Sequence, residues 1–259
     1  MRMMGWSTGA IAKADYESAL KTLDGEHINA VELSSLMLEE FAPMVERLVG
    51  DWRSLQLFQT GYQYVSIHLP GRFDAEQEKE VRSLAGDLTG NALVRDNFIL
   101  PRWDCQMVLH PNTVHDWSSW ETLQYHLLFE NMDKRRGFGT TVEDMEQVFE
   151  RLPHAGMCFD VGHALQIDET GGLAIEMLEA FHLRIRQVHI SHVNHKGVHY
   201  AMPEWFVGRV RELAHLIPPD AAIIIESPVN KEELPKELCR VIRALRPLPT
   251  HHILGDLPC

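Results

Sequence analysis

Six short apolar runs of the sequence each end in a histidine or a carboxylate. The residues at these ends are His68, His110, Glu130, Asp160, His189 and Glu226. If such groups are buried together, the lost solvation is costly unless a cation or mutual pairing compensates them. Imidazole and carboxylate ligands together suit Zn, Mn, Fe or Co better than Ca or Mg. The pattern therefore predicts a site for divalent metal ions.

The apolar runs alternate with amphipathic stretches along the whole chain. The candidate strands are Met3–Ser7, Ile28–Leu33, Tyr64–His68, Cys105–His110, His126–Glu130, Gly156–Asp160, Gln187–Ile190 and Ala222–Glu226. Helical periodicity is clearest in Val81–Leu88, Val142–Leu152, Leu173–Leu183 and Leu234–Leu245. Thr141 followed by Asp144 resembles a capping box that opens the second of these helices.

Eight strands that alternate with helices predict an α/β fold, a single (β/α)8 TIM barrel over residues 1–259 with 247–259 as a C-terminal tail. The alternative is a doubly wound open sheet, but its Gly-rich phosphate turn is poorly matched by STGAIAK. In a barrel, the metal-binding candidates would gather at the active-site end of the strands. The residues two positions before them should then fill the interior: Ser66, Val108, Leu128, Cys158, Gln187 and Ile224.

The net charge of the chain limits the kinds of molecule that it is expected to bind. The 259 residues carry a formal net charge of −13, which disfavours non-specific binding to DNA or anionic membranes. We expect a small sugar or sugar phosphate as partner, no duplex DNA and no membrane, with a homo-oligomer left open. Four cysteines without CxxC spacing and the lack of a secretory signal predict a reduced, cytoplasmic protein.

Four motifs resemble those of the xylose-isomerase-like TIM-barrel superfamily, which includes sugar isomerases, sugar epimerases and endonuclease IV. They are FENMD, CFDVGHA, VHISHVNHKGVH and IIIESPV, and the resemblance runs from about residue 5 to residue 245. It implies a shared metal site made of Glu130, Asp160, His189 and Glu226. His163 resembles a residue that contacts substrate in the epimerases and binds a further metal in endonuclease IV.

His68 and His110 resemble histidines that endonuclease IV uses for an additional metal, shared through Glu130. They imply a centre of two or three ions. The third site is in question, because His199 matches its histidine but Gly197 stands where that family has an aspartate. His192 or His195 could substitute as ligand, or the site is incomplete. A histidine at the position of His199 also occurs in the sugar isomerases.

These implications leave three functions open. The first is metal-assisted hydrolysis of a phosphoester in a small sugar phosphate or nucleotide, with two or three ions and with Glu130, Glu226 and His163 as catalytic residues. The alternative is a sugar (phosphate) isomerase or epimerase that uses one ion, with Glu130 and Glu226 moving the proton. The third is a metal-binding barrel without catalysis.

Two further residues are candidates for supporting roles. Glu32 could orient His68 by a hydrogen bond, as carboxylates do for metal-bound imidazoles, or could be a solvated residue at a strand end. Arg135, in the basic segment Lys134–Arg136, could bind a phosphate or carboxylate, or could belong to a solvated loop.

Overall fold

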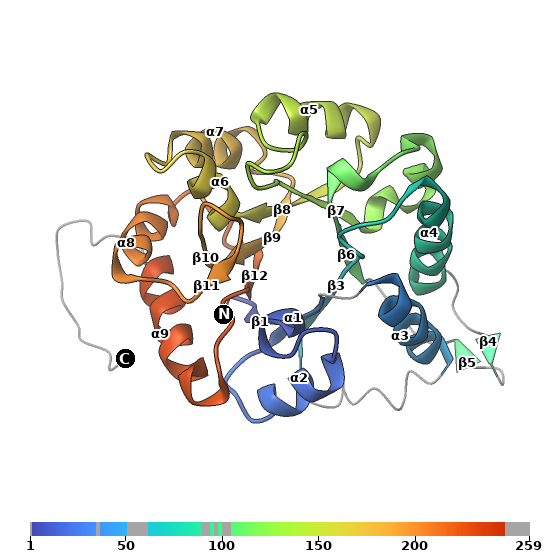
Figure 1. Ribbon diagram of the computed structural model, residues 1–259, viewed down its shortest axis with the longest axis horizontal. Coiled ribbons are helices and arrows are strands. Elements are labelled where there is room, and N and C mark those ends of the chain that lie inside the picture. The colour runs from blue at the N-terminus through green and yellow to red at the C-terminus, as the bar shows by residue number, and fades with distance from the viewer. Residues whose placement is uncertain are drawn as a thin grey trace.

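Eight parallel strands close into a barrel, which confirms the fold predicted from the sequence (Figure 1). The computed structural model describes residues 2–34, 37–50, 62–89, 94–95, 98–99 and 105–246, so the C-terminal tail lies outside the described residues. The order around the barrel is β1-β12-β9-β8-β7-β6-β3-β2. These strands are β1 (Met4–Ser7), β2 (Ala30–Leu33), β3 (Tyr64–His68), β6 (Gln106–Leu109), β7 (Leu127–Glu130), β8 (Gly156–Asp160), β9 (Ile185–Ile190) and β12 (Ala222–Ile225).

The first strand closes the barrel between β2 and β12. Gly5 pairs with Ala30 on one side and with Ile224 on the other. A Cβ atom built on Gly5 would lie 1.6 Å from the carbonyl oxygen of Ala30. The close approach of β1 and β2 therefore requires glycine at this position.

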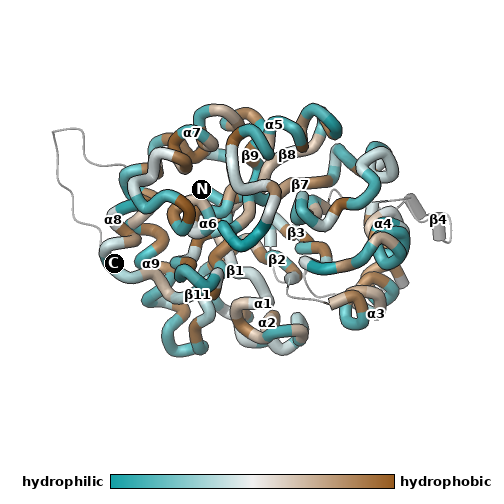
Figure 2. Tube along the Cα trace, turned by 45° about the horizontal axis from the view of Figure 1, so that its top comes forward, coloured by the Kyte–Doolittle hydropathy of each residue, from teal (hydrophilic) through white to brown (hydrophobic). Residues whose placement is uncertain are grey.

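Helices surround the barrel and carry both hydrophobic and hydrophilic residues along their length (Figures 1 and 2). The described α-helices are α1 (Thr8–Ile11), α2 (Tyr16–Leu23), α3 (Leu38–Gly50), α4 (Ala75–Thr89), α5 (Val142–Arg151), α6 (Val161–Ile167), α7 (Gly172–Ala180), α8 (Glu204–Leu213) and α9 (Leu234–Leu245). The capping box at the start of α5 is confirmed, with Thr141 and Asp144 each accepting from the other's backbone N–H.

Two helices differ in length from the prediction. α4 begins at Ala75, earlier than the predicted Val81, because Asp74 caps it by accepting from the N–H groups of Glu76 and Gln77. α7 ends at Ala180, earlier than the predicted Leu183. Leu183 is 83% exposed, so it does not continue the apolar face of that helix.

Shorter elements complete the chain. A 3-10 segment, η3 (Trp117–His126), takes the place of an α-helix between β6 and β7. Two shorter 3-10 segments are η2 (Pro111–Thr113) and η4 (Lys231–Glu233). Two antiparallel pairs lie outside the barrel, β10 (His192–Val193) with β11 (His199–Tyr200) and β4 (Val94–Arg95) with β5 (Phe98–Ile99).

The core has two parts. A large cluster fills the space between the strands and the helices, whereas Val108, Leu128 and Cys158 form a separate cluster inside the barrel. Ser66, Gln187 and Ile224 are also fully buried. The residues predicted to fill the interior are therefore all buried.

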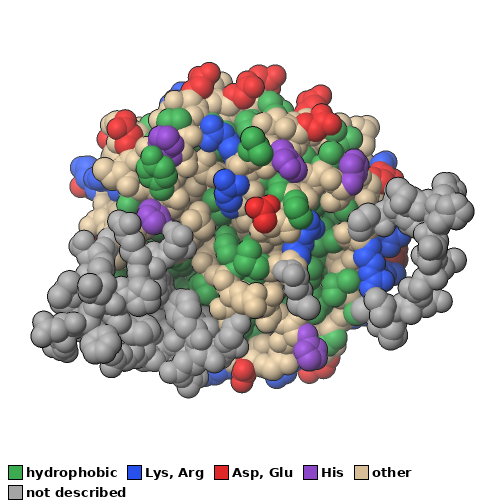
Figure 3. Space-filling model, turned by 180° about the vertical axis from the view of Figure 1, so that it is seen from behind, with side chains coloured by type: hydrophobic (Ala, Val, Ile, Leu, Met, Phe, Trp, Pro, Cys, Tyr) green, Lys and Arg blue, Asp and Glu red, His purple; other side chains and the backbone are tan. Residues whose placement is uncertain are grey.

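Charged side chains of both signs lie on the surface. On the face seen in Figure 3, acidic side chains gather along the upper margin, and Lys and Arg side chains stand among uncharged ones. No helix in the described part of the chain is long and apolar enough to cross a membrane.

Candidate metal centre

Four side chains from neighbouring strands converge at the carboxyl ends of the barrel strands. Glu130 and Asp160 end β7 and β8, His189 lies near the end of β9, and Glu226 directly follows β12. Each offers one ligand atom, and these atoms lie within 4.8 Å of one another. His189 Nδ1 is 3.0 Å from Glu130 Oε1 and 3.5 Å from Glu226 Oε2. This group is the set that the sequence implied for the shared metal site.

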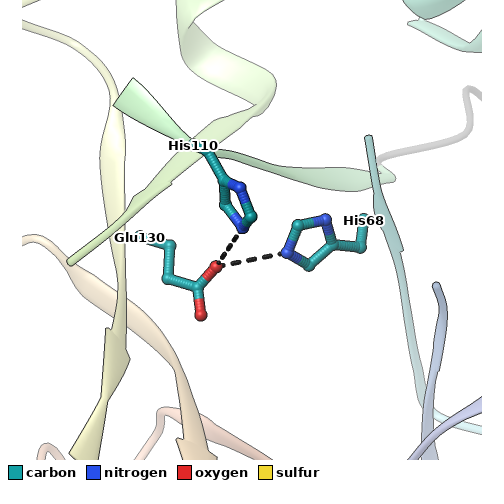
Figure 4. A group of neighbouring side chains, drawn as sticks. All are labelled: His68, His110 and Glu130. Carbon is teal, nitrogen blue, oxygen red and sulfur yellow. Dashed lines mark hydrogen bonds and ion pairs between the residues drawn. The ribbon is translucent and has the colours of Figure 1, made fainter. Parts of the chain in front are cut away.

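A second group meets the first at Glu130 (Figure 4). His68 ends β3 and His110 directly follows β6. Their Nε2 atoms lie 3.2 and 2.9 Å from Glu130 Oε2. Glu130 thus presents Oε1 to His189 and Oε2 to the two other histidines. A carboxylate that bridges two cations would present its oxygens in the same way.

Burial and neighbouring charges perturb the acids of this cluster in opposite directions. Burial raises the pKa of Glu226 to about 8 and that of Asp160 to about 6. The pKa of Glu130 is held well below its ordinary value, because His189, His110 and His68 outweigh the effect of burial. Conversely, burial lowers the pKa of His68, but the hydrogen bond to Glu130 and the charges of Glu32 and Glu130 together outweigh burial and raise this pKa to about 9. A divalent cation would favour the ionised form of every carboxylate here.

Asp160 carries an atom whose environment fits a cation. Its Oδ1 caps α6 by accepting from the backbone N–H of His163 at 2.7 Å. Its Oδ2 is buried and has no hydrogen-bond partner among the described residues. Burying a carboxylate oxygen without a partner is costly, so a bound cation would satisfy Oδ2.

In His68 and His163, a hydrogen bond from Nδ1 to a backbone carbonyl leaves Nε2 as the nitrogen that faces the cluster. His68 Nδ1 donates to the carbonyl of Leu69 at 2.8 Å, and His163 Nδ1 donates to the carbonyl of Asn131 at 2.9 Å. The Nε2 atom of His163 is then free to bind a cation, whereas Nε2 of His68 forms a hydrogen bond with Glu130 that a bound cation would replace. Asn131 also accepts from the N–H of Asp160 at 2.8 Å. The sequence analysis did not assign Asn131 a role, although it lies in FENMD.

Glu32 orients a different histidine from the one predicted. Its Oε2 lies 3.0 Å from His189 Nε2, and no hydrogen bond joins it to His68 within the described residues. The reason is that His68 Nδ1 already donates to Leu69, whereas Glu32 reaches across the interior from β2 to β9. Gln187 donates to the same oxygen of Glu32 at 2.6 Å. The carboxylate of Glu32 therefore turns His189 Nδ1 toward Glu130 and Glu226.

Beside the cluster, an arginine occupies the region of the third metal site that the sequence analysis left in question. A Cβ atom on Gly197 would lie 2.1 Å from Nη2 of Arg135, so the guanidinium fills the space beside this glycine. Arg135 also donates to both oxygens of Asp133, at 2.8 and 2.9 Å. The pKa of Asp133 is lowered to about 2, because its hydrogen bonds with Arg135 outweigh burial. A fixed cationic side chain thus stands where the resemblance implied a metal ligand.

Of the three histidines proposed for that region, one adjoins the cluster. His199 Nδ1 lies 2.7 Å from Ser191 Oγ and 3.4 Å from Glu226 Oε2. His192 instead packs against Trp205 and Phe206, with ring centroids 5.2 and 5.6 Å away. His195 is exposed in the turn between β10 and β11. Neither residue lines the pocket at the cluster, so the structure does not bring them to the site.

The cluster opens into a pocket of about 230 Å³. Its lining includes His68, His110, Glu130, His163, His199 and Glu226, together with Asp133, Arg135 and Arg136. The pocket is thus lined both by the candidate metal ligands and by Arg135 and Arg136 of the basic segment that follows β7.

Solved structures from several bacteria share this architecture. A 3-keto-D-glucoside 4-epimerase from E. coli is 12% identical, with 92% of this chain and 100% of that chain covered and a TM-score of 0.59. A xylose isomerase domain protein from Alicyclobacillus acidocaldarius is 14% identical, with 92% and 99% covered and a TM-score of 0.59. The chain has the xylose-isomerase-like TIM-barrel fold.

A further structure with this fold was solved with a metal. A xylose isomerase-like TIM barrel protein from Mycobacterium smegmatis, in complex with magnesium, is 13% identical, with 95% and 98% covered and a TM-score of 0.57. No protein-family model matches the sequence, and no curated protein matches it. At these identities the likeness establishes the fold, and the reaction has to be argued from the site.

Proposed function

We propose that the chain is a divalent-metal-dependent isomerase or epimerase that acts on a small sugar. The observation that carries this proposal is the convergence of Glu130, Asp160, His189 and Glu226 at the mouth of a xylose-isomerase-like barrel. The E. coli neighbour is an epimerase, which supports this alternative over the phosphoester hydrolysis favoured in the sequence analysis.

The four residues would hold one ion, which when bound polarises the oxygens of the substrate. Asp160 Oδ2, which has no hydrogen-bond partner among the described residues and lies 3.6 Å from His163 Nδ1, and the orientation of His189 by Glu32 support this assignment. Mixed imidazole and carboxylate ligands favour Zn, Mn, Fe or Co. Mg belongs in any test, because the Mycobacterium smegmatis protein was solved with it.

In the proposed reaction a proton leaves a carbon next to a carbonyl. It returns to the neighbouring carbon in isomerisation, or to the opposite face of the same carbon in epimerisation. Glu226 is our candidate for the base, since it lines the pocket and burial raises its pKa, to about 8 when no metal is bound. Glu130 is kept ionised by its histidine neighbours, so it would accept a proton less readily and would serve mainly to bind the metal and orient substrate. His163 lines the pocket with a free Nε2 that can contact a substrate hydroxyl.

Deuterium exchange tests the proposal without knowledge of the substrate. The protein, supplied in turn with Mg, Mn, Co, Fe and Zn, is incubated in D2O with a panel of free and phosphorylated sugars, and exchange next to the carbonyl is followed by NMR. We expect exchange with at least one sugar, reduced about 100-fold or more in Glu226→Gln. Arg209→Ala, on the outer helix α8, is the control and should exchange like the wild type. Absence of exchange with every sugar and metal would overturn the proposal.

Phosphoester hydrolysis is the second candidate, and one specific observation favours it. His68 and His110 form a second ligand group on the other oxygen of Glu130, and two adjacent ions suit attack on a phosphoester. Release of inorganic phosphate from the phosphorylated sugars, together with two or three ions per chain, would favour this function. One ion per chain and deuterium exchange would favour isomerisation.

A further inference from the structure

A second, larger pocket lies next to the pocket at the metal centre. Its volume is about 650 Å³, and Arg135 and Arg136 line both pockets. The rest of its lining comes from the segment after β6, from the segment between β7 and α5, and from α5 itself: Pro111, Asn112, Val114, Trp117, Gly137, Phe138, Gln147 and Arg151. The two pockets thus share a wall at the basic segment.

The charge of this second pocket is opposite to that of the protein as a whole. Among the described residues, its lining includes Arg135, Arg136 and Arg151 and no Asp or Glu. The whole chain has a formal net charge of −13. A concave site lined by charge of one sign concentrates ligands of the opposite sign, so this pocket favours an anion.

Two of the three guanidinium groups are available to a ligand. Arg135 is engaged by Asp133 through two hydrogen bonds. Within the described ranges, Arg136 and Arg151 form no ion pair and donate no side-chain hydrogen bond to the protein. Arg151 instead lies over the rings of Trp117 and Phe138, at 5.0 and 5.8 Å from their centroids.

The backbone that carries Arg136 is held in a defined turn. Its N–H donates to the carbonyl of Asp133 at 3.0 Å, and Met132 N–H donates to the carbonyl of Gly139 at 2.8 Å. This turn begins three residues after Glu130, and Arg136 also lines the pocket at the metal centre. A guanidinium on a fixed turn can bind a phosphate or carboxylate with two parallel hydrogen bonds.

The sizes of the pockets indicate how a ligand would lie. Small-molecule sites in proteins are commonly about 300–1,000 Å³. The pocket at the metal centre, at about 230 Å³, is below that range and suits only the reacting part of a substrate. The adjoining pocket has room for the remainder.

We propose that the second pocket binds the anionic group, a phosphate or a carboxylate, of a small substrate whose other end reaches the metal centre. Arg136 and Arg151 bind this group, and Arg135, held by Asp133, forms the wall between the pockets. The position of the reacting end rests on the proposed function, whereas the anion site does not depend on any reaction.

Ligand binding tests the anion site separately from activity. The protein is titrated by calorimetry with inorganic phosphate, and in a second arm with gluconate, to distinguish a phosphate from a carboxylate. We expect binding of at least one anion, weakened about tenfold or more in Arg136→Ala and partly restored in Arg136→Lys. Arg209→Ala is the matched control and should bind like the wild type, and circular dichroism establishes that each variant is folded.

Glu226→Gln separates this site from the metal centre. If the anion binds at the arginines, this variant retains its affinity within about twofold, whether or not it binds metal or has activity. Loss of anion binding in Glu226→Gln with full binding in Arg136→Ala would assign the anion to the metal and would overturn the proposal. So would the absence of binding of both anions. Failure of the deuterium exchange with intact, Arg136-dependent anion binding would reject only the proposed reaction.

Discussion

Glu130 is the residue at which both groups of ligand-type side chains meet. One of its oxygens faces His189 and the other faces His68 and His110. Three imidazoles around one buried carboxylate keep it ionised without any metal. The same arrangement lets the carboxylate serve one cation or two, so the number of ions depends on whether His68 and His110 pair with Glu130 or bind an ion themselves.

The orientation of His189 can be tested through Glu32. In Glu32→Gln the charge that turns His189 Nδ1 toward the cluster is lost, while the size of the side chain is kept. We expect metal affinity to fall about 10- to 100-fold, as measured by competition with a chromogenic chelator. Glu150→Gln, an exposed position on α5, is the control. Equal affinity in both variants would show that Glu32 does not orient a metal ligand.

Metal binding should depend on pH because three of the proposed ligands bind protons when the metal is absent. The pKa of Asp160 is raised to about 6 and that of Glu226 to about 8, and the neighbouring carboxylates raise the pKa of His189 well above its ordinary value, so an ion must displace protons from them. Affinity should be lowest below pH 6, rise between pH 6 and 8, and continue to rise above pH 8 because His189 must also lose a proton. Calorimetry at pH 7 in two buffers of different ionisation enthalpy should detect about two protons released per ion. An affinity that is constant from pH 5.5 to 8.5 would contradict these assignments.

The sequence predicted the side chains that converge but not the bonds that orient them. Asp160, His189 and Glu226 were identifiable because each follows an apolar run. The bond between Glu32 and His189 joins residues 157 positions apart, and no local pattern indicates it. Likewise, Gly197 could be seen to depart from the family pattern, but only the fold brings Arg135 into the space beside it.

At the scale of elements, α6 begins at the end of β8 and packs against the segment that follows β9. Asp160 caps this helix with one oxygen and leaves the other for the cluster, so the helix and the site share a residue. Gly162, in its first turn, approaches the neighbouring backbone closely. A Cβ atom here would lie 2.5 Å from the carbonyl oxygen of Ser191 and 2.6 Å from Val193.

Two glycine-to-alanine variants distinguish the effect of close packing at α6 from the effect of alanine on helix stability. Gly162→Ala should push α6 away from Ser191, destabilise the protein by about 1–3 kcal/mol and weaken metal binding, because Asp160 and His163 move with the helix. Gly208→Ala, in α8, meets no atom within 4 Å and should stabilise the protein by roughly 0.5–1 kcal/mol. Thermal unfolding and chelator competition measure both effects. Similar melting temperatures and metal affinities in the two variants would contradict this account.

The positions of strands were more predictable than the ends of helices. Strand positions followed from short apolar runs that end in a polar residue, and all eight were found within about two residues. Helix ends depended on caps and exposure. The start of α4 at Asp74, with Gln77 three residues later, matches a capping signal that the apolar periodicity alone did not reveal.

At the scale of the whole molecule, closure of the sheet into a barrel brings the residues of the sequence motifs together. The proposed ligands come from β3, β7, β8 and β9 and from the residues after β6 and β12, and only a closed ring of strands brings their ends together. The anion pocket lies on one side of this ring, so a substrate would reach from basic side chains to the metal. The motifs predicted the barrel, whereas the pocket depends on loops whose packing the sequence did not reveal.

Metal content per chain tests the central claim most directly. Protein purified without chelator, or reconstituted with Mn or Zn and desalted, is analysed by inductively coupled plasma mass spectrometry, alongside Asp160→Asn and Glu130→Gln with circular dichroism to verify folding. We expect at least one ion per wild-type chain, loss of that ion in Asp160→Asn, and loss of every ion in Glu130→Gln while the barrel stays folded. A wild-type protein that retains no ion, or variants that retain as much as the wild type, would contradict the account.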